Sequence, residues 1–271
     1  MTDFERLIVL EPMLRLSGFV LMIALLSWLQ WQFPLRADPD RRRRSWTNLS
    51  LSLINTLILR AGFPMLAVAW AVDVYQRDGG LFEAWSVPLW ANIPLAIVVL
   101  DVTIYWQHRL MHAVPMLWRL HRIHHVDRAM DLTTGVRFHP VEIMLSMSLK
   151  LALISLLGPH PVAVLVFELL LSLFALWTHT NVALPSSIDH RLRWVLVTPS
   201  MHRIHHSAWQ PETDSNYGFH LSCWDRVFGS YRSRPRHNER RMRIGLDGFA
   251  DDRDQGLLSL VLNPFRSKPR D

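Results

Sequence analysis

Residues 101–125 read DVTIYWQHRLMHAVPMLWRLHRIHH, an apolar helix-forming run that leads directly into two histidine clusters. The clusters have the patterns H-x-x-x-H and H-x-x-H-H, and a second H-x-x-H-H follows later in the chain. Because residues four apart share one face of a helix, each cluster can direct two imidazoles to one point. We predict that these eight histidines are ligands of a metal centre at a membrane surface: His108, His112, His121, His124, His125, His202, His205 and His206.

The composition limits the class of protein and of metal site. Half of the 271 residues are hydrophobic, and they gather into long runs. The formal net charge is +6, but the arginines stand between the apolar runs, which favours cytoplasmic flanks of membrane helices over a nucleic-acid partner. Cys223 is the only cysteine, so a single chain can form neither a disulfide nor a thiolate metal site. Any metal should therefore bind nitrogen and oxygen, and imidazole suits iron, zinc, copper and nickel.

The apolar runs and the arginines together predict a topology. Residues 16–33 are apolar and long enough to cross a bilayer core. The arginines at positions 41–44 should remain in the cytoplasm, which places the N-terminus outside. Every clustered histidine then falls on the cytoplasmic side. The other apolar runs cover residues 49–72, 87–106, 143–157 and 161–177.

We expect an all-α fold, namely an integral membrane bundle of four to five hydrophobic segments with a cytosolic, histidine-rich helical cap that holds a dimetal centre. Residues 1–100 would form N-terminal transmembrane helices, residues 101–231 the histidine-box catalytic region, and residues 232–271 a cytosolic tail. Residues 143–178 would form a spanning or a re-entrant hairpin, because the turn signal GPHP divides them. The expected location is a bacterial inner (plasma) membrane.

The number of histidines indicates two metals. One metal with four to six ligands cannot use eight imidazoles, whereas two metals can, and His139 and His179 raise the candidates to ten. Asp101 and Tyr105 lie on the same helix stripe as the first histidine pair. A carboxylate deep in an apolar helix indicates a functional site, so Asp101 is expected to orient a ligand histidine. Further candidates for such an orienting role are Tyr105, Asp127, Glu142, Asp214 and Asn216.

Four histidines stand outside the clusters. No second histidine accompanies them at a ligand spacing, and we expect loop or surface positions for His160, His190, His220 and His237.

Seven short motifs carry a family resemblance, and they occur in the order HRLMH, HRIHHVD, FHPVE, HTN, PSMHRIHHS, DSNYG and WDRVFGSY. With hydrophobic segments between them, they closely resemble the fatty acid hydroxylase/sterol desaturase superfamily over about residues 101–231. The resemblance implies a membrane non-haem di-iron enzyme, with two Fe ions as cofactor and O₂ as co-substrate, that hydroxylates or desaturates a lipid. It implies that all eight clustered histidines are ligands, together with His139 and His179. Ala175 replaces a histidine that fatty acid 2-hydroxylases carry, so that subgroup is not expected.

The expected partners follow from this chemistry. The lipid substrate would enter from the bilayer, and no nucleic acid is expected. Two electrons per turnover must come from an external donor, of the ferredoxin or cytochrome b₅ type, because no flavin, haem or iron–sulfur motif is visible. An acidic donor could dock on the basic cytoplasmic face. The arginines expected on that face include Arg119, Arg122, Arg203, Arg226 and Arg232.

Two other functions are considered. A membrane metal-binding or transport protein would have ligands along a transmembrane path, but the histidine clusters stand outside the apolar runs. A zinc-dependent hydrolase would need a glutamate inside its histidine motif, as in H-E-x-x-H, and none of the clusters has one. The sequence leaves open which lipid is oxidised, and whether the product is an alcohol or an alkene.

Overall fold

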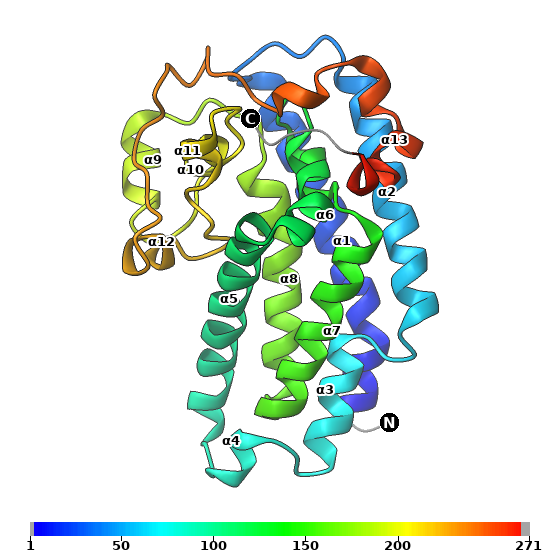
Figure 1. Cartoon of the computed structure of the whole chain (residues 1–271). Helices are drawn as coiled ribbons and strands as arrows, with labels where there is room; N and C mark the ends of the chain where they lie inside the picture. Colours follow the sequence, from blue (N-terminus) through cyan, green and yellow to red (C-terminus); the bar gives the residue numbers. More distant parts are fainter. Residues whose placement is uncertain (1–2, 267–271) are drawn as a thin grey trace.

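A bundle of long apolar helices carries a cap of short helices at one end (Figure 1). The structure is a computed structural model, and it describes residues 3–266. Over these residues the fold is all helical, without strands, as predicted. The helices of the bundle are α1 (Asp3–Gln32), α2 (Arg41–Gly62), α3 (Ala67–Gln76), α4 (Leu81–Ala84), α5 (Leu89–Ala113), α7 (Pro140–Leu157) and α8 (Pro161–Thr178).

The cap is built from short elements between and after the long helices (Figure 1). They are α6 (Pro115–His125), η1 (Leu132–Val136), α9 (Ser186–Leu192), α10 (Pro199–His205), α11 (Gln210–Thr213), α12 (Cys223–Val227), η2 (Asp247–Phe249), η3 (Asp252–Gln255), α13 (Leu257–Val261) and η4 (Asn263–Phe265).

Five helical segments of the described chain are long and apolar enough to cross a membrane, which confirms the predicted number of hydrophobic segments. α2, α3 and α4 form one of the five, and a break at Pro64 divides α2 from α3. Phe63 is extended there (φ −124°, ψ 115°), since the residue before a proline is driven out of the helical region. α7 and α8 each have 18 residues, or about 27 Å, which favours a spanning hairpin over a re-entrant one.

The outside of the bundle is apolar. None of the residues in the most apolar 18-residue window of α1 is buried inside the protein. Trp28, Trp31 and Trp90 expose half or more of their surface. An exposed apolar surface of this extent fits a lipid environment, with tryptophans at the membrane interfaces.

Two glycines join the loops at the end of the bundle opposite the cap. Gly158 ends α7 with φ +61°, and Gly80 precedes α4 with φ +98°. A Cβ atom on Gly158 would lie 1.8 Å from the carbonyl oxygen of Gly79, and one on Gly80 would lie 2.3 Å from the backbone nitrogen of Gly158. The α7–α8 turn can therefore pack on the α3–α4 loop only where side chains are missing.

We predict that Gly158→Ala destabilises the bundle. A left-handed conformation costs an L-residue about 1–2 kcal/mol, and the clash with Gly79 adds to this cost. Gly256→Ala is the control, because φ is −74° there and a new Cβ would meet nothing within 4 Å. Thermal unfolding in detergent should show a lowered Tm for Gly158→Ala only. Equal Tm values for the two variants would contradict this packing.

A buried ion pair holds the cap to α2. Arg44 Nε donates to Asp127 Oδ1 (2.6 Å) and Arg44 Nη2 to Asp127 Oδ2 (2.8 Å), while Asn48 and Thr134 also donate to Asp127. Burial opposes the charge of Asp127, but Arg44 and Arg137 hold its pKa at about 2. One arginine of the predicted orientation signal is therefore also a structural residue of the cap.

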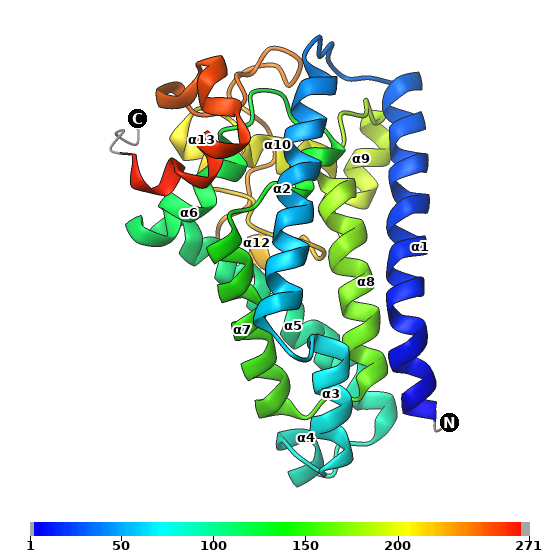
Figure 2. The ribbon, with the colours of Figure 1, turned by 90° about the vertical axis from the view of Figure 1, so that its right-hand side faces the viewer.

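The C-terminal segment crosses back over the cap and packs against α2 and α6 (Figure 2). Arg122 of α6 donates to Asn263 Oδ1 (2.7 Å), and Arg137 donates to Gln255 Oε1 (3.1 Å). The segment that was predicted to be a cytosolic tail thus covers the side of α6 that faces away from the bundle.

Candidate metal centre

A sharp break after α5 brings the first two histidine clusters together. Val114 is extended (φ −95°, ψ 118°) because Pro115 follows it, and Pro115 then occupies the first turn of α6. The chain folds back at this point. The ring centroids of His108 and His121 lie 4.9 Å apart, and those of His112 and His125 lie 4.8 Å apart.

Nine of the ten predicted ligand histidines converge into two groups. Within each group, one potential ligand atom of every residue lies within 4.8 Å of the others, and all nine side chains are buried. The five-histidine group contains His108, His112, His121, His125 and His205. The four-histidine group contains His124, His179, His202 and His206.

Each H-x-x-H-H motif contributes to both groups. In α6 the first and last histidines, four residues apart, belong to the five-histidine group, while His124 belongs to the four-histidine group. In the second motif, His202 and His206 belong to the four-histidine group, and only His205 belongs to the five-histidine group. The rings of His125 and His206 are stacked, with centroids 4.5 Å apart, where the two groups meet. The motif spacing therefore provides a shared wall for two neighbouring sites.

Backbone carbonyls determine the tautomers of four of these rings. His108 Nδ1 donates to the oxygen of Tyr217 (2.9 Å), His205 Nδ1 to that of Ser215 (2.8 Å), His179 Nδ1 to that of Ala175 (2.7 Å) and His124 Nδ1 to that of Arg137 (3.2 Å). A carbonyl oxygen can only accept, so each Nδ1 carries the hydrogen and each Nε2 presents a lone pair.

These lone pairs point at one another. His179 Nε2 lies 3.0 Å from His124 Nε2, 3.0 Å from His202 Nε2 and 3.2 Å from His206 Nε2. His124 and His179 both have the hydrogen on Nδ1, so no hydrogen bond can form between their Nε2 atoms. Two imidazole nitrogens bound to one metal at about 2.1 Å and at a right angle would lie about 3 Å apart. The donor set fits a metal ion.

The five-histidine group also has nitrogen atoms available for a metal. The Nε2 atoms of His108, His121 and His205 are buried and form no hydrogen bond with any described residue. Buried polar atoms normally have a partner, so three that face one space indicate a ligand. The residues present therefore fit two metal ions rather than one.

Two carboxylates support rings of this group from behind. Glu142 Oε1 accepts from His121 Nδ1 (2.7 Å), and Asp214 Oδ1 accepts from His112 Nδ1 (3.2 Å). This is the usual arrangement by which a carboxylate fixes the orientation and raises the basicity of a metal-ligating imidazole. Both residues were among the candidates for an orienting role.

The environment keeps the imidazoles neutral. Burial, together with the neighbouring histidines, lowers the pKa of His124, His125 and His202 well below the ordinary value. Burial also lowers the pKa of His179 and His205 to about 3. Since only the neutral imidazole binds a metal, protons do not compete with a metal at neutral pH.

His139 lies outside both groups, and we remove it from the candidate ligands. Its Nδ1 accepts from the backbone nitrogen of Val141 (3.1 Å), and its Nε2 faces the carbonyl oxygen of Val261 (3.1 Å). His139 is the N-cap residue of α7, and an imidazole that caps a helix has no nitrogen left for a metal.

Asp101 does not orient any of the nine histidines. Its Oδ1 pairs with His220 Nδ1 (2.5 Å), and its Oδ2 accepts from Trp224 Nε1 (2.8 Å). His220 lies in a loop, as expected, but it is buried rather than at the surface. The pair attaches the segment after α11 to the membrane helix α5.

The other predicted orienting residues form no hydrogen bond with the nine imidazoles. Tyr105 hydrogen-bonds Ser230 (2.7 Å). Asp127 belongs to the ion pair with Arg44 described above. Asn216, with φ +52°, donates to the carbonyl oxygens of Met201 and Arg232, and it joins α10 to the start of the C-terminal segment. Asn216 positions backbone, whereas Tyr105 and Asp127 hydrogen-bond other side chains, and these bonds do not reach the nine rings.

Sequence reasoning missed the carbonyl groups and the residue that arranges one of them. Asp225 accepts from the backbone nitrogens of Tyr217 (2.7 Å) and Gly218 (2.9 Å) and from Ser230 Oγ (2.7 Å). It thereby shapes the loop whose Tyr217 carbonyl receives His108. The motifs DSNYG and WDRVFGSY contain these residues, but a motif does not say that its contribution is a backbone oxygen.

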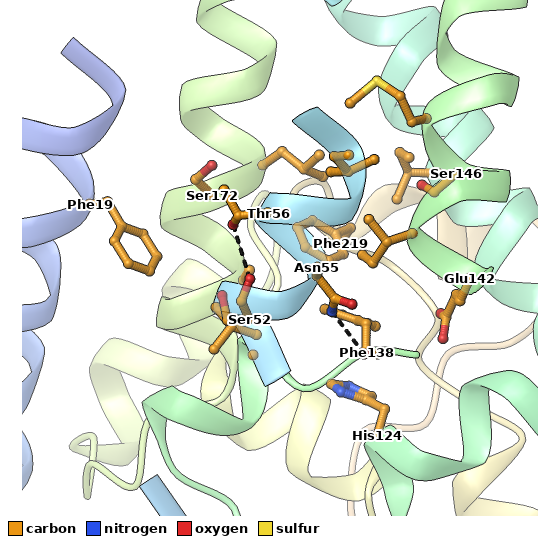
Figure 3. A pocket seen from close by; sticks show the side chains of 18 of the residues that line it. Phe19, Ser52, Asn55, Thr56, His124, Phe138, Glu142, Ser146, Ser172 and Phe219 are labelled. Atoms are coloured by element: carbon orange, nitrogen blue, oxygen red, sulfur yellow. Dashed lines mark hydrogen bonds between the residues drawn. The ribbon is translucent and has the colours of Figure 1, made fainter. Parts of the chain in front are cut away.

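A cavity of about 600 Å³ extends from the histidines into the membrane bundle. His108, His124 and His202 line one end, and α1, α2, α5, α7 and α8 supply the walls. Figure 3 shows Phe138 beside His124, and Asn55 of α2 donates to the Phe138 carbonyl (2.9 Å). The two histidine groups thus face a cavity that lies among the membrane helices.

Comparison with known proteins identifies the family. Residues 93–230, just over half of the chain, match the family model described as fatty acid hydroxylase. The chain therefore belongs to the fatty acid hydroxylase family, which confirms the resemblance seen in its motifs.

Three relatives show the range of proteins that this chain resembles. It is 32% identical over 210 residues to the ornithine lipid hydroxylase OlsE of Rhizobium tropici, covering 77% of this chain and 60% of the relative. It is 33% identical over 218 residues to the alkylglycerol monooxygenase of Homo sapiens (80% and 46%) and 28% identical over 162 residues to the lathosterol oxidase of Homo sapiens (59% and 50%). The chain thus spans about half the length of these relatives. No solved structure matches it significantly.

We predict that His179→Ala lowers the metal content of the purified protein to about half, because it dismantles the four-histidine group and leaves the other group complete. His139→Ala is the matched control, a buried histidine outside both groups. Elemental analysis of both variants against the unmodified chain provides the measurement. A full metal content in His179→Ala, or a halved one in His139→Ala, would reverse our assignment of these two residues.

Proposed function

We propose that this protein is a membrane di-iron oxygenase that acts on a C–H bond of a lipid. The observation that carries the proposal is the position of the two buried imidazole groups at the cap end of a cavity within the membrane bundle. Relatives named as lipid hydroxylases, monooxygenases and sterol oxidases support it.

The chain's own residues would hold and shield the reacting groups. Nine imidazoles would bind the irons, and Glu142 and Asp214 would orient His121 and His112. When bound, a pair of iron ions supplies the one-electron and O₂ chemistry that no amino-acid side chain can provide. The apolar cavity walls would admit a lipid and exclude water, which protects reactive species from side reactions.

The imidazole set also favours iron chemistry over hydrolysis. Each group consists of histidines alone, and the two carboxylates nearest the rings, Glu142 and Asp214, are hydrogen-bonded to Nδ1 atoms. Neither carboxylate is therefore placed as a general base for a water molecule. Whether the reaction ends as hydroxylation or as desaturation depends on the substrate carbon.

The electrons would come from an external donor of the ferredoxin or cytochrome b₅ type. Two of the arginines proposed for its docking face are buried, because Arg122 binds Asn263 and Arg203 binds Glu239 and the Thr180 carbonyl. Arg119 remains exposed. Further exposed arginines stand on the segment after Tyr231, and an acidic donor would meet them there: Arg234, Arg236, Arg240 and Arg241.

The proposed location is a bacterial inner membrane with the cap in the cytoplasm. The arginines at positions 41–44 lie at the cap end of α2, as the positive-inside rule requires for this orientation. A cytoplasmic cap would also give the metal centre access to soluble reductant.

We predict that the iron-loaded protein oxidises membrane lipids only when both O₂ and a reductant are present. His205→Ala should lower turnover about 100-fold or more, because it removes a ligand whose Nδ1 is already fixed by Ser215. His190→Ala, at an exposed site, should retain full turnover. Mass spectrometry of lipids after reaction under ¹⁸O₂ would detect an incorporated oxygen or the loss of two hydrogens. An unmodified chain that holds iron yet oxidises no lipid would refute the proposal.

A further inference from the structure

The far end of the cavity contains charged residues, although it lies inside the membrane bundle. Glu11 and Arg15 of α1 and Arg60 of α2 line the cavity together with apolar side chains. Arg60 is 12 residues beyond Asn48, the residue that binds Asp127 in the cap, which places it about 18 Å further along α2. That depth is well inside a hydrocarbon layer about 30 Å thick, where an ionised side chain is costly and indicates a functional site.

The charges around Arg15 cancel among themselves. Arg15 pairs with Glu11 (3.0 Å) and with Glu168 of α8 (3.0 Å), and Glu168 also pairs with Lys150 of α7. These two cations and two anions form a closed set that joins α1, α7 and α8. No further anion is left in this set for another cation.

Arg60 is the cation that remains. It makes no hydrogen bond or ion pair with any residue of the described chain, and its side chain is exposed. The other carboxylate that lines the cavity, Glu142, lies at the opposite end on His121. The deep end of the cavity therefore carries one net positive charge with no counter-charge from the protein.

Residues of both α1 and α2 line the cavity, although these two helices are not packed on each other. α1 packs on α8 and α2 packs on α7, with little direct contact between α1 and α2 (Figure 2). Phe19 of α1 faces Ser52 and Thr56 of α2 across the cavity (Figure 3). A lipid could thus enter sideways, past the charged residues, without passing through the cap.

We propose that this cavity binds a membrane lipid that carries an acidic group, a phosphate or a carboxylate, and that Arg60 is the residue that pairs with it. The inference rests on the proposed function, because it names the class of substrate for the same site. An arginine forms short, charge-assisted hydrogen bonds with either group, and the low dielectric constant of the surrounding hydrocarbon layer would strengthen them.

The geometry also indicates how such a lipid would lie in the cavity. Asn55, which contacts Phe138 next to His124, stands five residues before Arg60, a separation of about 7.5 Å along α2. With its acidic group on Arg60, the lipid would extend past Asn55 toward the histidines.

The test compares lipid binding by Arg60→Gln, Arg42→Gln and the unmodified full-length chain. Arg42→Gln is the matched control, since this substitution removes the same charge from an exposed position on the same helix. Native mass spectrometry in detergent would measure binding of dioleoyl phosphatidylglycerol, oleate and dioleoyl phosphatidylcholine. We expect the unmodified chain and Arg42→Gln to prefer an anionic lipid, and Arg60→Gln to lose that preference by about tenfold.

Preferred binding of phosphatidylglycerol would indicate a phosphate ligand, and preferred binding of oleate would indicate a carboxylate ligand. Equal binding of anionic and neutral lipid by the unmodified chain, or an unchanged preference in Arg60→Gln, would overturn the inference. Turnover separates it from the proposed function. If the protein oxidises a neutral lipid at a rate that Arg60→Gln does not change, the inference is refuted and the proposed oxygenase function is retained. If the anion preference depends on Arg60 but no lipid is oxidised, the binding inference is retained and the oxygenase function is refuted.

Discussion

The convergence of imidazole lone pairs is the constraint on which the structure depends. His124 and His179 each donate through Nδ1 to a carbonyl, so their Nε2 atoms meet at 3.0 Å with no hydrogen between them. Packing of neutral rings in this way is repulsive unless a cation lies among them. Much of the cap serves to hold these rings in place, from the break at Val114 to the ion pair of Arg44 with Asp127.

The same constraint explains why the site lies at the end of the bundle. α5 delivers His108 and His112, and α8 delivers His179, as these helices leave the apolar region. The other six histidines come from α6 and from the α10 segment of the cap. Neither the histidines of the membrane helices nor those of the cap form a complete metal site alone. A metal bound between them would join membrane helices to cap, so metal loading should be part of the stability of the whole chain.

Much of this could be predicted from local pattern. Apolar runs, arginine placement and the i, i+4 spacing of histidines are short-range signals, and they predicted the helices and eight of the nine histidines that converge. The ninth, His179, was a candidate from the ligand count and the family motif HTN. They could not identify His139 as a helix cap, because a histidine before a proline looks the same in either role. They could not pair Asp101 with His220, 119 residues away, because that contact exists only after α5 and the cap loop pack together. The carbonyl groups that accept hydrogen bonds from the histidines could not be predicted either. Every residue has a carbonyl, and only the folded structure shows which ones lie next to the imidazole rings.

The most direct test of the central claim is the iron content of the unmodified protein, purified in detergent and reconstituted anaerobically with Fe(II). We expect two tightly held irons per chain, with an X-ray absorption spectrum dominated by imidazole nitrogen. One iron per chain, none, or a spectrum dominated by oxygen ligands would contradict the two imidazole groups as metal sites.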